Sequence, residues 1–146
     1  MSDTLTNLLY HIVFGTRDRR RVLTPELRDD LYPYIGGIVK GEGGRVVRIG
    51  GTRDHVHLLA LFPPTVTLSD MMRRIKGNSS KRFGDYPYFA WQSGYAAFSV
   101  SESSVEDVTQ YIDRQEQHHR RMGFEEEFLK LLDRHGVDYN KKYLWD

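Results

Sequence analysis

The chain is organised around the stretch Gly51-Thr52-Arg53-Asp54-His55-Val56-His57-Leu58-Leu59-Ala60-Leu61-Phe62. In a β-strand, residues two apart share a face and lie about 6.6 Å from each other. His55 and His57 are therefore expected on one face of a strand, with Val56 and Leu58 facing the core. Two imidazoles on one face suit a metal ion, and two surface histidines on a half-exposed strand give the same pattern. A third ligand from elsewhere in the chain would favour the metal site.

Length and composition exclude several classes of protein. The chain has 146 residues, enough for one domain that buries its own core, so we expect a single domain over residues 1–146. The absence of cysteine excludes thiolate zinc sites, favours a reducing compartment and leaves nitrogen and oxygen as metal ligands. No apolar run approaches the ~20 residues of a membrane-spanning helix, and the N-terminus lacks a targeting pattern. We therefore expect a soluble, cytoplasmic protein.

The charges are clustered although their sum is small. The formal net charge of +1 says little about a polyanionic partner. Two basic clusters stand out, the first formed by Arg17, Arg19, Arg20 and Arg21 and the second by Arg73, Arg74, Lys76, Lys81 and Arg82. Such clusters are usually solvated, and they are also where contacts to a nucleic-acid backbone are expected. The run Glu125-Glu126-Glu127 forms an acidic cluster.

Apolar periodicity and capping residues predict four strands and four helices. The strands are expected around residues 10–14, 45–49, 55–62 and 95–100, and the helices around 25–40, 68–83, 104–115 and 124–135. In chain order the elements read β-α-β-β-α-β-α-α. The first six are those of a ferredoxin-like split βαβ sandwich, an α+β fold whose antiparallel sheet carries helices on one face. C-terminal helices follow, and the first and third strands lie at the centre of such a sheet.

Tyr111 and Gln115 are the candidates that would complete a site. They are four residues apart on a predicted helix, so they project from one side of it. Two imidazoles, a side-chain carbonyl and substrate oxygens would make an open site for Mg²⁺ or Mn²⁺. A phenol beside that ion indicates nucleophilic phosphoryl chemistry. The alternative is that Tyr111 packs its ring in the core and Gln115 lies on the surface.

Three further histidines are weaker candidates. His11 is expected to be packed or hydrogen-bonded within its strand, and it would line the site only if that strand lies beside the histidine strand. His118 and His119 are adjacent and cannot share a helix face, so we expect both to be solvated.

Several motifs in the same order carry a resemblance to a known family. They are Tyr10-His11-Ile12-Val13-Phe14 with the basic turn after it, Asp54-His55-Val56-His57-Leu58-Leu59, Arg73-Arg74-Ile75-Lys76, Trp91-Gln92-Ser93-Gly94-Tyr95 and Tyr111-Ile112-Asp113-Arg114-Gln115. Over about residues 5–121 the chain resembles the single-tyrosine, histidine-hydrophobe-histidine transposases of the IS200/IS605 type and their relatives associated with repetitive extragenic palindromes. Residues 122–146, a predicted helix and a tail, lie outside the resemblance.

The resemblance implies a role for each candidate. His55 and His57 would be metal ligands, Gln115 would complete the metal site, and Tyr111 would be the nucleophile. Attack by Tyr111 would form a covalent 5′-phosphotyrosine and release a 3′-hydroxyl, and a second 3′-hydroxyl could later displace Tyr111 and rejoin strands. The substrate would be single-stranded DNA whose ends fold into hairpins, held by the two basic clusters. The family also implies a homodimer in which the histidine pair of one subunit meets Tyr111 of the other.

Two other functions fit the same residues. A ferredoxin-like sheet with basic and aromatic surface, here Phe83, Tyr86, Tyr88, Phe89 and Trp91, is typical of single-stranded nucleic-acid-binding modules. A domesticated nuclease or recombinase would use the transposase chemistry without a mobile element of its own. The binding module differs from both enzymes at Tyr111, because it would form no covalent adduct.

Overall fold

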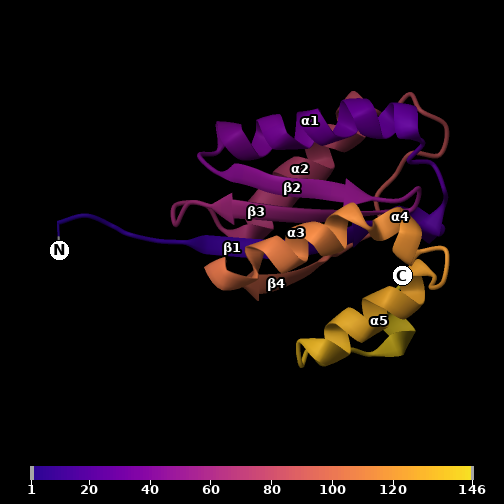
Figure 1. The fold of residues 1–146 in the computed structure, drawn as a ribbon. Helices are drawn as coiled ribbons and strands as arrows, with labels where there is room; N and C mark the ends of the chain where they lie inside the picture. Colours follow the sequence, from indigo (N-terminus) through magenta and orange to yellow (C-terminus); the bar gives the residue numbers. More distant parts are fainter. Residues whose placement is uncertain (1, 146) are drawn as a thin grey trace.

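The computed structural model describes residues 2–145, which contain one four-stranded antiparallel sheet (Figure 1). The strands are β1 (Leu8–Gly15), β2 (Arg45–Gly51), β3 (His55–Phe62) and β4 (Ala96–Val100), in the order β2-β3-β1-β4. The helices are α1 (Pro25–Gly41), α2 (Leu68–Arg82), α3 (Val105–Asp113), α4 (Gln115–His118) and α5 (Phe124–Arg134). The 3₁₀ turns are Arg17–Arg19, Glu102–Ser104 and Lys141–Tyr143. This order of elements and strands confirms the ferredoxin-like α+β fold, with β1 and β3 at the centre.

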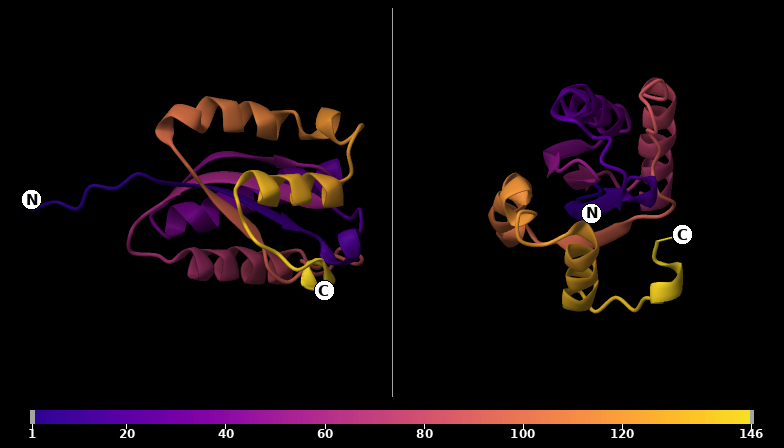
Figure 2. Two further views of the ribbon diagram at one scale, coloured as in Figure 1. Left: turned by 90° about the horizontal axis from the view of Figure 1, so that it is seen from below. Right: turned by 90° about the vertical axis from the view of Figure 1, so that its right-hand side faces the viewer.

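The first two helices cover one face of the sheet, as Figure 2 shows. The pleat of the central strands places Ile12, Phe14, Val56 and Leu58 on this face, and each is at most 1% exposed. They form the main core with apolar residues of the two helices, which are Leu27, Leu31, Ile35 and Val39 from α1 and Met71, Met72 and Ile75 from α2. The burial of Val56 and Leu58 confirms the predicted orientation of the histidine strand.

The C-terminal helices cover the opposite face, and this positions the candidate site. Ile112 of α3 packs with Leu9 and Leu59 in one small cluster. Residues of α5 form a second cluster with β1 and β4, namely Phe124, Leu131 and Leu132 packed on Val13, Ala96 and Phe98. The two central strands are therefore buried on both faces, so the alternative of a half-exposed histidine strand is wrong.

The predicted starts of α1 and α2 are confirmed, and one predicted helix is interrupted. Thr24 and Thr67 cap α1 and α2, because their hydroxyl oxygens accept hydrogen bonds from backbone N–H groups three residues on. Pro33 lies inside α1 without ending it. The helix expected to run through Gln115 breaks instead at Arg114, whose backbone angles (φ −98°, ψ 15°) separate α3 from α4.

The aromatic segment before β4 mostly extends the core. Phe83, Phe89 and Trp91 are buried, and the indole N–H of Trp91 donates to Ser79 Oγ at 2.8 Å. Of the aromatic side chains in this segment, Tyr86 and Tyr88 are exposed. A row of free rings for stacking on bases is thus not present here. Within residues 2–145, no helix combines the length and apolar character needed to cross a membrane.

Candidate active site

The site is built on the face of the central strands that α3, α4 and α5 cover. His55 and His57 project from β3 on this face, and both are fully buried. His11 projects beside them from β1, because Val13 pairs with His57 and His11 lies two residues from Val13 on the same face. Three imidazoles therefore gather at the centre of the sheet.

The ring of His55 is oriented by its own connecting loop. Its Nδ1 lies 2.8 Å from Asp54 Oδ1 and 3.1 Å from Thr52 Oγ1. The carboxylate at Nδ1 holds the ring so that Nε2 faces the interior of the site, where it donates to the oxygens of Gln115 and Glu127 in the absence of a metal. The tight loop between β2 and β3 thus positions the imidazole.

His57 is oriented by His11. The Nδ1 atom of His57 lies 2.8 Å from Nε2 of His11, so one of the two rings donates to the other. The Nε2 atom of His57 then faces the interior 3.2 Å from the Glu127 carboxylate, as Nε2 of His55 does at 3.3 Å. The expectation that His11 is hydrogen-bonded in its strand is met, and His11 also lines the site.

Tyr111 of α3 and Gln115 of α4 both reach the histidines from the helices that cover this face of the sheet. The break between the two helices does not separate them. Gln115 is 1% exposed, and its Oε1 lies 2.9 Å from Nε2 of His55. The ring of Tyr111 lies 5.6 Å from the ring of His57, centroid to centroid. The alternative of a surface Gln115 is therefore wrong, and one chain brings all four predicted site residues together.

Glu127 of α5 is the central residue that the sequence analysis missed. It is 1% exposed, and its Oε1 lies 3.3 Å from Nε2 of His55, 3.2 Å from Nε2 of His57 and 3.0 Å from Nε2 of His119. Its Oε2 accepts hydrogen bonds from Nε2 of Gln115 at 2.9 Å and from the hydroxyl of Tyr111. The carboxylate thus joins the imidazoles to the phenol.

Local packing explains how α5 reaches the site. Phe124 stacks on the imidazole of His55 with ring centroids 4.1 Å apart and planes 7° apart. Gly15 permits this approach, since a Cβ there would lie 2.7 Å from Cε2 of Phe124. Glu127 follows Phe124 by three residues and precedes Leu131 by four, so it lies on the apolar stripe of α5. That position on the stripe is the signal that distinguishes Glu127 from the solvated Glu125 and Glu126.

The expectation that His118 and His119 are both solvated is wrong, because Nε2 of His118 lies 3.5 Å from the Glu127 carboxylate and His119 lies closer still. The side chain of His119 is 10% exposed, and its Nε2 lies 3.0 Å from Oε1 of Gln115. Two adjacent residues cannot share a helix face, but one of them can lie on the face of Gln115, and His119 is four residues beyond it. Both imidazoles reach the same carboxylate because α4 ends at His118, so the two residues do not lie on one continuous helix.

Burial and charge shift the pKa values in this cluster in different directions. Burial lowers the pKa of His57 to about 4 and that of His11 to about 3, so both rings are neutral near pH 7. For His55, burial is outweighed by Asp54 and Glu127, which raise its pKa to about 9. For Glu127 itself, burial is outweighed by the surrounding imidazoles, which hold its pKa well below the usual range.

Tyr111 is held in its neutral form at rest. Burial and the neighbouring Glu127 carboxylate raise the pKa of the Tyr111 phenol above its usual value. A phenol in this state donates its hydrogen bond to the carboxylate and is a weak nucleophile. Any chemistry at this oxygen needs positive charge brought close to it.

The donor atoms of the cluster fit a divalent metal ion. His55, His119 and Glu127 each offer a ligand atom, and these atoms lie within 4.8 Å of one another. Neutral His57 adds a further Nε2 beside them, 3.2 Å from the carboxylate. Imidazole nitrogen with carboxylate and amide oxygen is a ligand set that divalent ions such as Mn²⁺ accept, and Asp54 and His11 hold the rings in the ligating orientation.

The first basic cluster lies close to this site, and one of its arginines already interacts with the C-terminal part of the chain. Arg19 forms an ion pair with Glu125 at 2.5 Å and lies 4.8 Å from the ring of Trp145, so it holds the C-terminal part of the chain. Arg21 lines a cavity of about 350 Å³ that also contacts Arg53, Arg120 and His119. Basic side chains therefore border the side of the site next to His119.

The second basic cluster lies on α2, on the other side of the sheet. Arg73 pairs with Asp70 at 3.3 Å and Arg74 pairs with Glu42 at 3.2 Å, all with partly exposed side chains. The ammonium of Lys76 donates to the backbone carbonyls of Gln92 at 2.6 Å and Gly94 at 2.7 Å. The structure does not bring this cluster to the candidate site.

Comparison with known proteins identifies relatives of the chain. The family model described as "Transposase IS200 like" matches residues 4–115. The ISDra2 transposase TnpA of Deinococcus radiodurans is 30% identical over 117 residues, which are 74% of this chain and 84% of that protein. The transposase for insertion sequence element IS200 of Salmonella typhimurium is 27% identical over 124 residues, 79% of this chain and 81% of that protein.

Two solved structures share the fold. A protein from Deinococcus radiodurans R1 assigned as a transposase superposes with a TM-score of 0.62 at 27% identity, covering 79% of this chain and 95% of that one. A REP-associated tyrosine transposase bound to a REP hairpin superposes with a TM-score of 0.59 at 16% identity, covering 85% of this chain and 76% of that one.

These similarities define the class of protein as a transposase, which is an enzyme. The chain belongs to the IS200-like family of tyrosine transposases, as the resemblance in its motifs implied. The family match ends at Gln115, so His119 and all of α5 lie beyond it.

Proposed function

We propose that this transposase cleaves and rejoins single-stranded DNA at hairpin-bearing ends, with a divalent metal ion and a 5′-phosphotyrosine on Tyr111. The observation that carries the proposal is the hydroxyl of Tyr111 at the edge of a buried cluster of imidazoles and a carboxylate. A structural relative is described as bound to a REP hairpin, which supports hairpin DNA as the substrate.

The ion would be held by His55, His57 and Gln115, with His119 and Glu127 as further ligands from beyond the family match. When bound, Mg²⁺ or Mn²⁺ supplies positive charge and Lewis acidity next to the scissile phosphate. The Nε2 atoms of both strand histidines already face the position where the carboxylate of Glu127 lies. Little rearrangement of these rings would be needed.

The chain's own part in the reaction is the attack by Tyr111. The phenol oxygen forms a bond to phosphorus, the bond from phosphorus to the 3′ oxygen of the preceding nucleotide breaks, and the phenol proton ends on that departing oxygen. The phosphotyrosine keeps the energy of the phosphodiester, so a second 3′-hydroxyl can displace Tyr111 and rejoin strands. Neither ATP nor attack by water is required.

The basic residues would hold the DNA backbone at two places. Arg21, Arg53 and Arg120 border the site beside His119 and would contact the strand near the cleavage point. The cluster on α2 would contact a more distant part such as the hairpin stem. Neutralising either cluster should weaken binding to many sequences alike and flatten its dependence on salt.

Assembly as a homodimer is proposed through β4. This strand lies at an open edge of the sheet, where a second copy could pair across a two-fold axis. The family resemblance implies shared sites, but here Tyr111 lies beside the His57 of its own chain. Its helix is also closely seated, since a Cβ on Gly50 would lie 2.8 Å from Cγ2 of Ile112. We therefore propose that each subunit cleaves with its own tyrosine.

The test is a denaturing gel of the protein incubated with Mn²⁺ and single-stranded oligonucleotides that cover both flanks of its gene. Wild type and Tyr143→Phe, a change at an exposed tyrosine, should form a covalent complex with DNA. Tyr111→Phe should form none while still binding the hairpin, and excess EDTA should stop the wild type. Adduct formation by Tyr111→Phe at the wild-type level would overturn the proposal, as would a wild-type protein that binds these strands without any adduct.

A further inference from the structure

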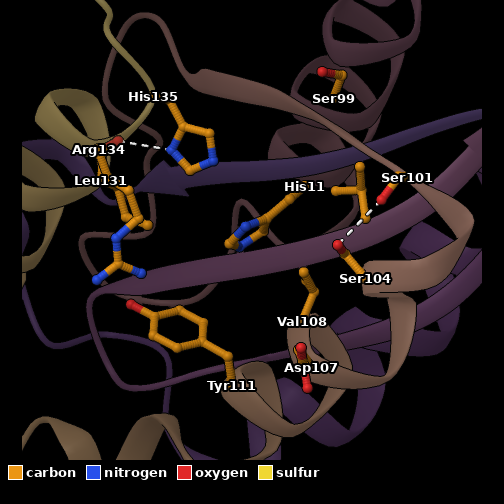
Figure 3. Close-up of a pocket in the computed structure, with 11 residues that line it drawn as sticks. His11, Ser99, Ser101, Ser104, Asp107, Val108, Tyr111, Leu131, Arg134 and His135 are labelled. Carbon is orange, nitrogen blue, oxygen red and sulfur yellow. Dashed lines mark hydrogen bonds between the residues drawn. The ribbon is translucent and has the colours of Figure 1, made fainter.

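The face of the sheet that the C-terminal helices cover also carries a cavity of about 430 Å³. It lies between β4, α3 and α5 and is bordered by Tyr111 (Figure 3). Its volume lies in the range of about 300–1,000 Å³ typical of small-ligand sites. The carboxylate of Glu127 engages one side of Tyr111, and this cavity opens on another. A group bound in the cavity would therefore lie next to the proposed nucleophile.

The two ends of the cavity differ in chemistry. At one end, Figure 3 shows the guanidinium of Arg134 beside the phenol of Tyr111. At the other end lie the side chains of Ser101, Ser104 and Asp107, with Ser101 Oγ donating to Ser104 Oγ at 3.1 Å. A cation stands near the nucleophile, and acceptor oxygens stand away from it.

The walls between these ends are apolar and partly fixed. Val108 and Leu131 face each other across the cavity from α3 and α5. His135 is held in place because its Nδ1 donates to the carbonyl of Leu131 at 2.8 Å and its ring stacks on Phe98 at 4.0 Å. A flat ring could lie between such walls.

We propose that the cavity binds the nucleotide next to the scissile phosphate, with Arg134 on the phosphate and Asp107 and the two serines reading the base. This inference rests on the proposed function, since it assumes that a DNA phosphate reaches Tyr111. The planar fork of an arginine suits phosphate oxygens, and a carboxylate accepts from the exocyclic amino group of a base. A base with such an amino group should therefore be preferred.

Two residues of the cavity lie beyond the family match at residues 4–115. Arg134 is the last residue of α5, the helix that also supplies Glu127, and His135 caps that helix. The C-terminal helix would then contribute both to the metal site and to the choice of cleavage position. Its role would be positioning and recognition.

The experiment uses a library of single strands in which a hairpin is followed by a randomised segment. Full-length protein with Mn²⁺ is incubated with the library, covalent complexes are recovered from a denaturing gel, and the attached and released DNA are sequenced. For wild type, one position beside the cleaved phosphate should favour adenine, cytosine or guanine over thymine.

Three variants separate the predicted contacts. Asp107→Asn should remove or change the base preference at that position while adducts still form. Arg134→Ala should lower the initial rate of adduct formation about tenfold, the loss expected for one charge-assisted hydrogen bond, and Arg134→Lys should restore part of it. Lys130→Ala, on the same helix but outside the cavity, is the matched control and should match wild type. All three positions are exposed, and thermal unfolding of each variant confirms that it is folded.

The outcomes are distinguishable from a failure of the proposed function. If wild type forms no adduct on any strand, the transposition chemistry proposed above is overturned and the inference falls with it. If wild type forms adducts but shows no base preference beside the cleaved phosphate, or if Asp107→Asn and Arg134→Ala behave as Lys130→Ala does, the nucleotide site is overturned while the proposed chemistry stands.

Discussion

Replacing Glu127 by alanine should lower the free energy of unfolding of the metal-free protein by about 3–5 kcal/mol, the usual cost of removing one partner from a buried charged cluster. The carboxylate is 1% exposed and accepts from Gln115 at 2.9 Å, from Tyr111 and from His119 at 3.0 Å. It also faces His55 at 3.3 Å, whose pKa of about 9 makes it protonated at pH 7. Three donors, from Gln115, Tyr111 and His119, at about 1 kcal/mol each and the charged His55 at about 2 kcal/mol give about 5 kcal/mol, at the upper end of this range.

The assay is urea unfolding followed by far-ultraviolet circular dichroism at pH 7 in EDTA. Glu126→Ala is the matched control, because Glu126 is exposed and only pairs with Lys130 at 3.6 Å. Its loss should stay below about 0.5 kcal/mol. Glu127→Gln keeps the shape and one acceptor oxygen. Its loss of unfolding free energy should therefore lie between the losses of Glu126→Ala and Glu127→Ala.

An equal, small loss for Glu127→Ala and Glu126→Ala would refute the reasoning. It would mean that the carboxylate of Glu127 is solvated and that α5 does not cover the histidines. A second measurement separates stability from ligation. Calorimetric titration of the folded proteins with Mn²⁺ should give a weaker dissociation constant for Glu127→Gln than for wild type.

Three further predictions concern the core, the pH dependence and the assembly. Leu58→Ala, which opens a cavity in the fully buried main core, should cost roughly 2–5 kcal/mol in the same unfolding assay, and a loss under 1 kcal/mol would place Leu58 outside the core. The metal-free protein should lose stability as the pH rises from about 6.5 to about 9. The pKa of His55 is raised in the folded state, so the folded protein holds more protons than the unfolded chain across that interval. Unfolding midpoints measured against pH should therefore fall, and a midpoint that rises would contradict the prediction. Co-expressed His57→Ala and Tyr111→Phe subunits should stay inactive in DNA cleavage if each chain uses its own tyrosine, whereas recovered cleavage would establish the shared arrangement that the family resemblance implied.

Much of the fold could be predicted because its signals are local. Alternation in residues 55–62 and the caps at Thr24 and Thr67 each depend on a few neighbouring residues. The same local periodicity placed Tyr111 and Gln115 on one side of a helix. The break at Arg114 was missed because nothing in the residues around it, such as proline or glycine, marks the end of a helix there.

The order of the elements, the two faces of β3 and the residues of the family motifs follow from local sequence patterns. Which side chains lie opposite those residues depends on tertiary packing. Periodicity shows that Glu127 lies on the apolar stripe of α5, but which surface that stripe covers depends on packing between Phe124, Gly15 and His55, which are far apart in the sequence. For the same reason His11 could be placed beside His57 only from the pairing of β1 with β3. Neighbouring residues in the chain determine the face of a helix or strand on which a side chain lies. The packing of elements distant in the sequence determines which side chains it contacts.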